Sequence, residues 1–432
     1  MRRVQSLYYL EKGFQMKKSL LLLSLFFSCA YTQTLSLEQS IEKTLLNNPD
    51  IQSFILKTEL SQKNYDVTFA DNLPQINLQA EYDFAQTYTS SSNGTFYTTE
   101  KNGGYSGASL KQRIWDFQKT SSKLDSLKID EDIASLSLED MKALMAYKIK
   151  SLYKLIVVQK EAIEVHKKDL DSKKAYYEQA QGLVSQGFKT KADTSRFLSA
   201  VYFSEENLAI AQASFDKTKK SLSLYMGEKI KDDTTFESDI IKKNYSFEPD
   251  LVEEEILSNN SQLKINALNI DKNKLLYKSE KASHYGSIDV VASYNHFDTL
   301  NEYNTSTIGV TVVVPLYSGG RIEAETQKAR INIQLAKREQ SSKILAIKES
   351  LSNLLIDIAR YDKTIASKQA QLHWANDTKD VLEGRYKEGL STYIEVLDAE
   401  SLILTAQLEL LEAYYAKSTS IDQVDYLKGK IQ

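Results

Sequence analysis

Four long segments of the chain contain neither proline nor glycine, and this limits what the chain can fold into. They are residues 108–181, 188–226, 321–383 and 390–428. An ordinary globular helix has about 11–12 residues, whereas a helix over the longest segment would extend on the order of 100 Å at about 1.5 Å per residue. The sequence therefore predicts an elongated helical molecule and disfavours a compact enzyme.

Apolar residues in the first of these segments follow coiled-coil spacing. Leu124, Leu127, Ala134 and Leu138 belong to one seam, and further apolar residues such as Ile133 lie outside it. An isolated two-stranded coiled coil needs only one seam. Two seams predict neighbouring helices on both sides, as in a ring of helices, although a thick bundle would give the same pattern.

The chain contains a tandem duplication. Residues 45–82 align with residues 257–294 without a gap, at an offset of 212. Residues 107–227 align with residues 309–429 at an offset of 202. Internal repeats at a fixed spacing indicate a duplicated structural unit. The ten-residue difference between the two offsets falls between the aligned blocks, which predicts a loop of variable length there.

Each repeat is expected to contain a helical stretch, two strands joined by a loop, and two long helices joined by a glycine turn. In the first repeat, residues 31–227, we expect the helical stretch at 37–71, strands at 75–86 and 106–116, and long helices at about 118–181 and 190–226. In the second, residues 250–432, we expect the helical stretch at 250–283, strands at 287–297 and 306–317, and long helices at about 319–383 and 392–428. Residues 228–249 are expected to link the repeats.

The predicted strands alternate apolar and polar side chains with a period of two. In the first strand, one face carries Ile76, Leu78, Ala80, Tyr82 and Phe84. Aromatic residues gather at the strand ends, as they do at the two interfaces of an outer-membrane barrel. A soluble sheet packed on one face would alternate equally.

The connections between paired strands are rich in serine, threonine, asparagine and glycine. They span residues 87–105 in the first repeat and 296–307 in the second. Such a composition is typical of solvent-exposed hairpin connections, so we expect loops at both places.

The N-terminus has the pattern of a secretory signal peptide. Residues 16–18 are Met-Lys-Lys, residues 19–27 are apolar, and small residues lead to Ala30. The apolar run is shorter than the roughly 20 residues of a membrane-spanning helix. We expect residues 1–30 to be the signal peptide, with residues 1–15 as an upstream extension. A buried N-terminal helix is the alternative.

Charge and composition argue against several functions. Without residues 1–30 the chain has 49 basic and 57 acidic side chains, a net charge of −8, and no basic patch for nucleic acid. Cys29 is the single cysteine, so there is no disulfide framework or thiolate metal site; lipidation of Cys29 is an alternative to plain cleavage after Ala30. The four histidines lack metal-ligand spacing, and no glycine loop suits a phosphate. We expect no enzyme activity, cofactor or metal.

Two segments resemble the TolC family of outer-membrane efflux proteins. They are residues 314–321, Val-Pro-Leu-Tyr-Ser-Gly-Gly-Arg, and residues 385–400, Arg-Tyr-Lys-Glu-Gly-Leu-Ser-Thr-Tyr-Ile-Glu-Val-Leu-Asp-Ala-Glu, and the two Asn-Asn segments add to the similarity. The resemblance covers about residues 35–429. It implies an α+β membrane protein that forms a homotrimer in a Gram-negative outer membrane. Each chain would give four strands to a twelve-stranded barrel and long antiparallel helices to a periplasmic tunnel of roughly 100 Å.

The four-strand count agrees with an oligomer. A membrane barrel needs about eight strands or more, and open sheet edges are not tolerated in lipid. The family resemblance further implies a passive conduit that a periplasmic adaptor and an inner-membrane transporter open for efflux or type I secretion.

The resemblance assigns roles to the turns between the long helices. Gly187, Phe188, Gly389 and Leu390 match the periplasmic tips that meet the adaptor. Glu395 and Asp398 match acids that line the narrowest ring of the tunnel, where six carboxylates in a trimer would favour cations. The alternative for both is a solvated helix N-terminus, where acids are favoured in any case.

The resemblance also suggests how the aperture closes. Asp193 and Tyr386 match an acid and a tyrosine that the family often links to a basic residue, but Ser391 occupies that basic position here. We expect Arg196, facing Asp398, to substitute. Two other classes remain open, a secreted coiled-coil scaffold without a pore and the periplasmic adaptor itself. The repeated strand–loop–strand unit argues against the adaptor, and the alternating strands argue against the scaffold.

Overall fold

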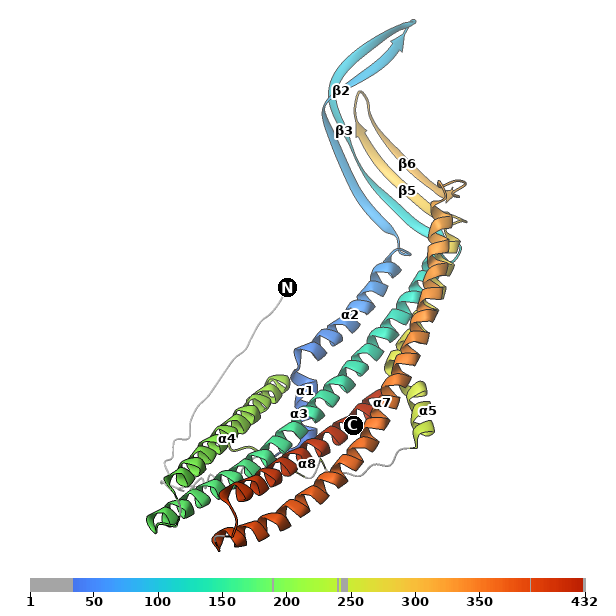
Figure 1. Ribbon diagram of the computed structural model, residues 1–432. Coiled ribbons are helices and arrows are strands. Elements are labelled where there is room, and N and C mark those ends of the chain that lie inside the picture. The colour runs from blue at the N-terminus through green and yellow to red at the C-terminus, as the bar shows by residue number, and fades with distance from the viewer. Residues whose placement is uncertain (1–33, 189, 239–240, 242–247, 389, 430–432) are drawn as a thin grey trace, which may run out of the picture.

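The computed structural model describes residues 34–429 except 189, 239–240, 242–247 and 389. The expected signal peptide, with its upstream extension and its single cysteine, lies outside the described residues. The molecule is elongated, with a four-stranded sheet at one end and two long helical hairpins at the other (Figure 1). We call the end of the hairpins away from the sheet the helical tip.

The two repeats contain the same elements in the same order. The first has α1 (Leu37–Asn47), α2 (Pro49–Ala70), β2 (Gln75–Ser92), β3 (Thr95–Trp115), α3 (Lys119–Ser185) and α4 (Lys191–Met226). The second has α5 (Pro249–Asn259), α6 (Ser261–Ala282), β5 (Ser287–Asp298), β6 (Glu302–Val313), α7 (Arg321–Lys387) and α8 (Tyr393–Leu427). Two short strands, β1 (Thr34–Leu35) and β4 (Thr235–Phe236), pair in parallel and connect the N-terminal segment to the segment between the repeats.

The helical stretch expected over residues 37–71 is two helices. Asn48 has extended backbone angles, and its side chain accepts a hydrogen bond from the Asp50 backbone N–H at 2.9 Å. Pro49 follows at the first helical position, where its missing N–H costs nothing. In the second repeat, Asn260 caps α6 and also donates to the Leu427 carbonyl at 2.8 Å. Each Asn-Asn segment thus separates two short helices and binds the C-terminal end of the long helix that closes its repeat.

The long helices continue beyond their first glycines, so the expected ends at 181 and 383 are wrong. α3 includes Gly182 and ends at Ser185, and α7 includes Gly384 and ends at Lys387. A glycine inside a helix costs only about 1 kcal/mol relative to alanine. Packing of each long helix against its neighbours outweighs that cost.

The loop expected over residues 87–105 is also wrong, because β2 and β3 extend through it. The strands meet at a two-residue turn, Asn93-Gly94, in which both residues have positive φ angles of 49° and 79°. This is the type I′ geometry that Asn-Gly favours in tight hairpins. Threonine and tyrosine are common in this segment, and both favour strands. The loop expected over 296–307 is likewise mostly strand.

The sheet is antiparallel, with the strand order β2-β3-β5-β6. Among the described residues, the outer edges of β2 and β6 therefore have no strand beside them. The expected second strand of repeat 2 ends at Val313 rather than residue 317. Pro315 follows and has no N–H to donate to a ladder.

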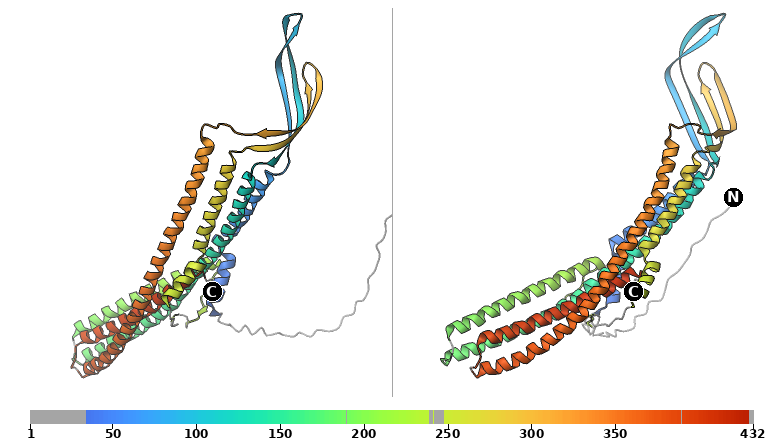
Figure 2. Two further views of the ribbon diagram at one scale, coloured as in Figure 1. Left: turned by 90° about the vertical axis from the view of Figure 1, so that its right-hand side faces the viewer. Right: turned by 45° about the vertical axis from the view of Figure 1, so that its right-hand side comes forward.

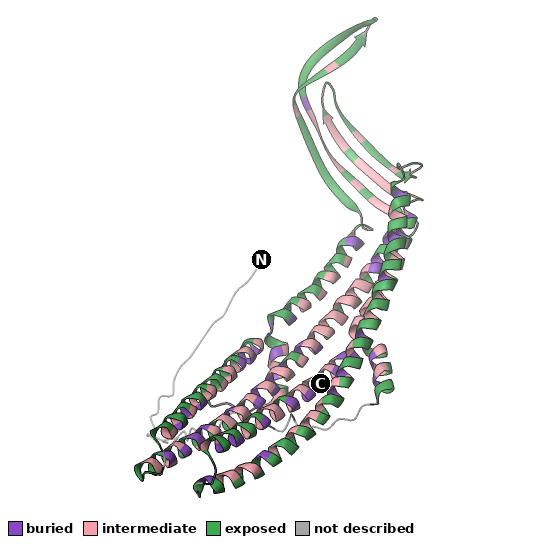
Figure 3. Ribbon diagram, in the orientation of Figure 1, coloured by how far each residue is buried: buried purple, intermediate pink, exposed green. Residues whose placement is uncertain are grey.

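One face of the sheet is apolar and exposed. Leu78 is 86% exposed, Phe84 is 89% exposed and Ile308 is 83% exposed, and Figure 3 shows how much of the sheet is accessible. The opposite face carries Asn77, Gln79 and other polar residues. No helix in the described part of the chain has an apolar stretch long enough to span a membrane.

A β-bulge in β2 marks the end of the apolar band. Asp83 pairs with Gly103 and Gln86 pairs with Lys101, so β2 contains one extra residue between these pairs. The bulge reverses which residues face outward, and beyond it the outward face continues with polar residues such as Thr87. From residue 76 to residue 84 the band is about 27 Å along the strand, or about 21 Å across a membrane at a tilt of about 40°.

The substitutions Leu78→Lys and Gln79→Lys compare the effect of a lysine on the two faces of the sheet. If the apolar face contacts lipid, a lysine within the apolar band should destabilise the folded protein, by up to about 2–4 kcal/mol at the middle of the membrane. Gln79 lies on the other face, and its side chain is exposed in the chain. We expect the yield of heat-modifiable, membrane-inserted protein to fall for Leu78→Lys only. Equal yields of the two variants would contradict this orientation.

Candidate functional site

The helical tip consists of two turns with the same geometry. After α3, the Phe188 N–H donates to the Leu183 carbonyl at 2.9 Å, and Gly187 has a φ of +78°. After α7, the Leu390 N–H donates to the Arg385 carbonyl at 2.8 Å. The first is the six-to-one hydrogen bond of a Schellman motif, with Gly187 as its left-handed residue. The second turn has the same six-to-one hydrogen bond.

The predicted docking residues lie on the outside of these turns. Phe188 is 73% exposed and Leu390 is 68% exposed. Gly187 has open space around its Cα, and Gly389 lies outside the described residues. Each turn therefore presents one large apolar side chain to solvent at the helical tip.

The two predicted acids nearest the turns are helix caps. The Asp193 carboxylate accepts hydrogen bonds from the backbone N–H and the hydroxyl of Thr190, each at 2.9 Å. The Glu395 carboxylate accepts the same two bonds from Thr392, at 2.7 Å and 3.0 Å. Both are capping boxes. The Thr392 backbone N–H, then its hydroxyl, lower the pKa of Glu395 below its usual value, so this carboxylate is ionised at neutral pH.

Asp398 and Arg196 are both exposed, and within one described chain their side chains form no ion pair with each other. The Arg196 guanidinium lies 5.2 Å from the centre of the Tyr393 ring, a cation–π contact between α4 and α8. Among the described residues, no ion pair within 4.0 Å joins Arg196 to Asp398. The substitute latch expected from the sequence therefore does not form within a chain. Ser391 is buried, and its hydroxyl donates to the Leu382 carbonyl at 3.1 Å.

An aromatic cluster joins all four long helices just behind the turns. Phe197 of α4 is fully buried at its centre. Its ring centroid lies 6.1 Å from that of Tyr176 of α3, 6.4 Å from that of Tyr386 of α7, and 5.7 Å from that of Tyr393 of α8. Burial, and then the Asp193 charge, raise the pKa of the Tyr386 phenol. The predicted residue Tyr386 is thus part of a core that holds the two hairpins together.

Sequence reasoning missed the other members of this cluster. Each long helix has an aromatic residue within eleven positions of its turn glycine, and this recurrence was the available signal. Tyr176 and Phe197 contact each other within the first hairpin. Phe197 also contacts Tyr386 and Tyr393 of the second hairpin, because the hairpins lie side by side, as Figure 2 shows.

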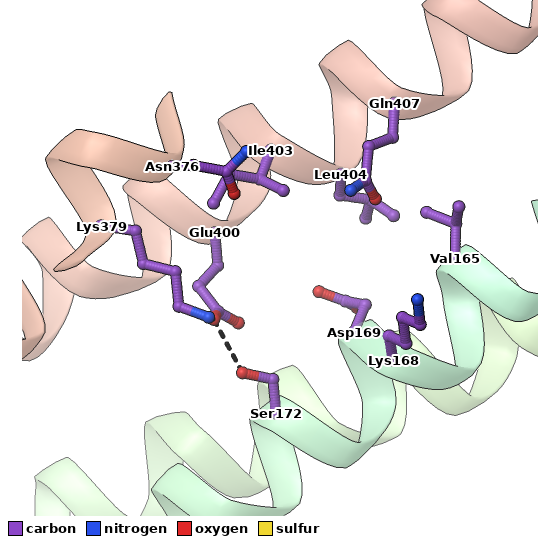
Figure 4. Close-up of a pocket in the computed structure, with 10 residues that line it drawn as sticks. All are labelled: Val165, Lys168, Asp169, Ser172, Asn376, Lys379, Glu400, Ile403, Leu404 and Gln407. Atoms are coloured by element: carbon purple, nitrogen blue, oxygen red, sulfur yellow. Dashed lines mark hydrogen bonds and ion pairs between the residues drawn. The ribbon is translucent and has the colours of Figure 1, made fainter. Parts of the chain in front are cut away.

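A buried charge cluster lies farther from the tip, between α3, α7 and α8 (Figure 4). The Glu400 carboxylate is within 2.7 Å of the Ser172 hydroxyl, 2.9 Å of the Lys379 ammonium and 3.2 Å of the Lys173 ammonium. Lys173 also pairs with Asp169 at 3.3 Å. Only 5% of Glu400 is exposed. Burial by itself would raise the pKa of Glu400, but hydrogen bonds from Lys379 and Ser172 and the nearby lysine charges lower it overall.

The described residues contain no cluster of metal-ligating side chains. None of their histidine, cysteine, aspartate and glutamate side chains come together in a group of three or more that could hold a metal ion. The cavity beside Glu400 has a volume of about 190 Å³, below the roughly 300–1,000 Å³ of ordinary ligand pockets. The chemistry of the helical tip is that of caps, aromatic packing and ion pairs.

Comparison with known proteins identifies one family. The model for outer membrane efflux proteins matches residues 40–228 and 252–429, one match in each repeat. The chain is 21% identical to outer membrane protein TolC of Escherichia coli over 414 residues, which cover 89% of this chain and 80% of TolC. It is 22% identical over 406 residues to the probable outer membrane lipoprotein SilC of Salmonella typhimurium, covering 88% of this chain and 82% of SilC.

The solved structures show the same fold. CusC, whose structure is described in connection with transmembrane channel formation, superposes with a TM-score of 0.78 at 16% identity, covering 91% of each chain. The α+β, tandemly duplicated fold predicted from the sequence is confirmed.

Phe197→Ala and Phe203→Ala test the aromatic cluster. Removing the fully buried Phe197 ring should destabilise the packing of the tip by about 3–5 kcal/mol, whereas Phe203 on the same helix is 64% exposed. We expect trypsin to cleave after the exposed Lys191 at the turn much faster in Phe197→Ala than in the parent protein or Phe203→Ala. Equal cleavage rates in the two variants would show that the cluster does not order the tip.

Proposed function

Because the chain belongs to the outer membrane efflux protein family, which places it in the outer membrane, we propose that it forms a homotrimeric channel-tunnel there. The family consists of channel-forming proteins rather than enzymes, and the chain is a channel for efflux or secretion. The trimer is supported by the four-stranded sheet. Its apolar face is exposed, and among the described residues its two outer edges have no neighbouring strand.

The open edges require other copies of the chain. In lipid, every backbone N–H and C=O must find a partner, so a sheet with free edges cannot remain in the membrane. If β6 of one copy pairs with β2 of the next, three copies close a barrel of twelve strands, above the minimum of about eight. The apolar face would then contact outer-membrane lipid, and the polar face would line the lumen.

The helical hairpins would continue the conduit into the periplasm. Exposed apolar residues along the helices support contacts with neighbouring copies; they include Leu56, Leu60, Ile331, Leu335 and Leu345. The tip turns at Gly187, Phe188, Gly389 and Leu390 would dock a periplasmic adaptor, because an exposed phenylalanine and leucine suit an apolar contact. An inner-membrane transporter would supply the energy, and docking would open the passive tunnel.

Acidic residues at the tip would set the properties of the aperture. Glu395 and Asp398 from three chains would give six carboxylates around the axis and favour cations. Glu395 also caps α8, and the two roles are compatible because a capping carboxylate remains charged. Tyr386 and Asp193 would hold the tip closed within a chain, and Arg196 would reach an acid only in a neighbouring copy.

Single-channel recordings of the detergent-extracted protein in planar bilayers test both the channel and its aperture. Glu395→Gln/Asp398→Asn removes two charges per chain, and glutamine still serves in a capping box. We expect the parent channel to prefer cations and this variant to lose the preference. Asp380→Asn/Glu412→Gln removes two exposed acids elsewhere on α7 and α8 and should behave like the parent.

The outcomes separate the channel from the aperture. Unchanged selectivity in Glu395→Gln/Asp398→Asn would reject the acidic ring and leave the channel. Absence of conductance, together with failure of the folded protein to partition into membranes, would reject the channel in favour of a secreted coiled-coil scaffold.

A further inference from the structure

Three aromatic side chains lie side by side on the polar face of the sheet. Tyr105 of β3 pairs with Phe297 of β5, and Phe297 pairs with Tyr303 of β6. The ring centroids of Tyr105 and Phe297 are 5.5 Å apart with their planes inclined by 30°, and those of Phe297 and Tyr303 are 5.0 Å apart and inclined by 14°. The rings therefore form a short stack across three strands. We call Tyr105, Phe297 and Tyr303 the aromatic row.

The aromatic row lies on the opposite side of the sheet from the apolar band. Tyr105 pairs directly with Glu81 of β2, and cross-strand partners share one face of a sheet. Glu81 follows Gln79 by two residues, so both belong to the polar face. The aromatic girdles of a membrane barrel face outward, whereas this row would face the lumen. Phe297 is one residue from the end of β5, which places the row near the barrel end farthest from the helices.

The stack ends in a ring face that is turned toward a carboxylate. Two nearly parallel rings with centroids 5.0 Å apart overlap face to face in an offset stack. The axis of the stack therefore runs across the strands, and the outer face of Tyr105 is turned toward β2. The Glu81 side chain is exposed there, and its carboxylate lies near the Tyr105 hydroxyl. An aromatic face and a negative charge thus lie beside each other.

Glycines provide space on both sides of Tyr105. Gly103 and Gly107 are its next neighbours on the same face of β3. A Cβ atom at Gly103 would lie 3.1 Å from the Tyr88 hydroxyl, and one at Gly107 would collide with the side-chain oxygen of Asn295. Oxygen atoms of Tyr88 and Asn295 thus take the room that larger side chains at the two glycine positions would fill. They add hydrogen-bond acceptors beside the Tyr105 ring.

The charge around the aromatic row is negative. Glu81 and Asp83 are next neighbours on the polar face of β2, and neither carboxylate forms an ion pair within the part of the chain that the structure describes. Lys101 lies on the same face of β3, where its ammonium donates to the Thr299 carbonyl at 2.6 Å. Two acids and one lysine leave a net charge of −1. Aromatic faces beside a net negative charge favour a cation over a neutral or anionic compound.

We propose that Glu81 and the aromatic row form a binding site for organic ammonium cations on the inner wall of the barrel, one site in each chain of the trimer. The cation lies against the outer face of Tyr105, within about 6 Å of the ring centre, where the ring quadrupole attracts it. Glu81 supplies the opposite charge. The inference rests on the proposed channel, in which the polar face borders the lumen. It names a class of exported compound and a place where that compound binds before its release.

Binding of benzyltrimethylammonium to the detergent-extracted protein tests the site directly. Tyr105→Leu removes the ring face, and Glu81→Gln removes the charge. We expect each change to weaken binding by about threefold to tenfold in a saturation-transfer NMR titration. Tyr105→Phe keeps the ring and should bind like the parent. Phe96→Leu and Glu100→Gln remove an exposed ring and an exposed acid from the other face of β3, and they should also match the parent.

An uncharged ligand separates recognition of charge from damage to the sheet. Benzyl alcohol has an aromatic ring but no ammonium group, so we expect the parent to bind it more weakly than benzyltrimethylammonium. Glu81→Gln should leave the affinity for benzyl alcohol unchanged. An equal loss of affinity for both ligands in Glu81→Gln would overturn the recognition of cations.

Channel recordings locate the site along the conduit. In planar bilayers, benzyltrimethylammonium added on the barrel side should reduce the current at a lower concentration than on the side of the helical tip, because the site lies near the barrel mouth. In Glu81→Gln the same reduction should require a concentration at least about threefold higher. In Glu395→Gln/Asp398→Asn the effect from the barrel side should equal that in the parent, since these acids lie at the other end.

The outcomes distinguish the site from the channel. If the protein conducts, but Tyr105→Leu and Glu81→Gln bind the cation as tightly as Phe96→Leu and Glu100→Gln, the site is overturned and the channel stands. If the cation binds in the expected pattern but folded protein gives no conductance, the proposed function fails, and the role of the site in export fails with it.

Discussion

The structure depends on the need of backbone hydrogen-bonding groups in lipid to find partners. The large sheet of one chain has four strands, and among the described residues the outer edges of β2 and β6 have no neighbouring strand. In the proposed channel, this one deficit makes other copies necessary. The proposed assembly would also cover the apolar face of the sheet and the apolar helix residues that are exposed in one chain. The β-bulge after Asp83 ends the apolar band at the point where the membrane would end.

The two repeats share their turns and caps, and the buried charge cluster departs from the repeat pattern. Both repeats use an asparagine to separate two helices and bind a third, a turn with a six-to-one hydrogen bond between the long helices, and a capping box to begin the returning helix. The Glu400 cluster has no such counterpart. The residue that corresponds to Glu400 in the first repeat is Leu198, and Ala375 corresponds to Lys173. The charges therefore belong to the single seam between α3 and α8, which the repeat relation does not duplicate.

Local rules explain what could be predicted. Absence of glycine and proline indicated the long helices, period-two alternation indicated the strands, and the repeat offsets indicated the architecture. The errors arose where context outweighs a local rule. Gly182 and Gly384 stay helical because neighbouring helices hold them, and residues 87–105 form strands because Asn93-Gly94 turns so tightly. At the site, the sequence located the two turns, and it weighed a solvated helix N-terminus as the alternative setting of Glu395. The roles of Glu395 and Tyr386 at the aperture stay predictions.

By itself, the sequence determined the elongated shape, the duplication and the positions of the turns, because these follow from interactions among residues close together in the chain. Only the tertiary structure decided which side chains meet across the seam. Ser172 and Glu400 are 228 residues apart, and no periodicity links them. Their contact depends on how the hairpins are rotated and how far each has shifted along the other, and packing of the whole molecule sets both.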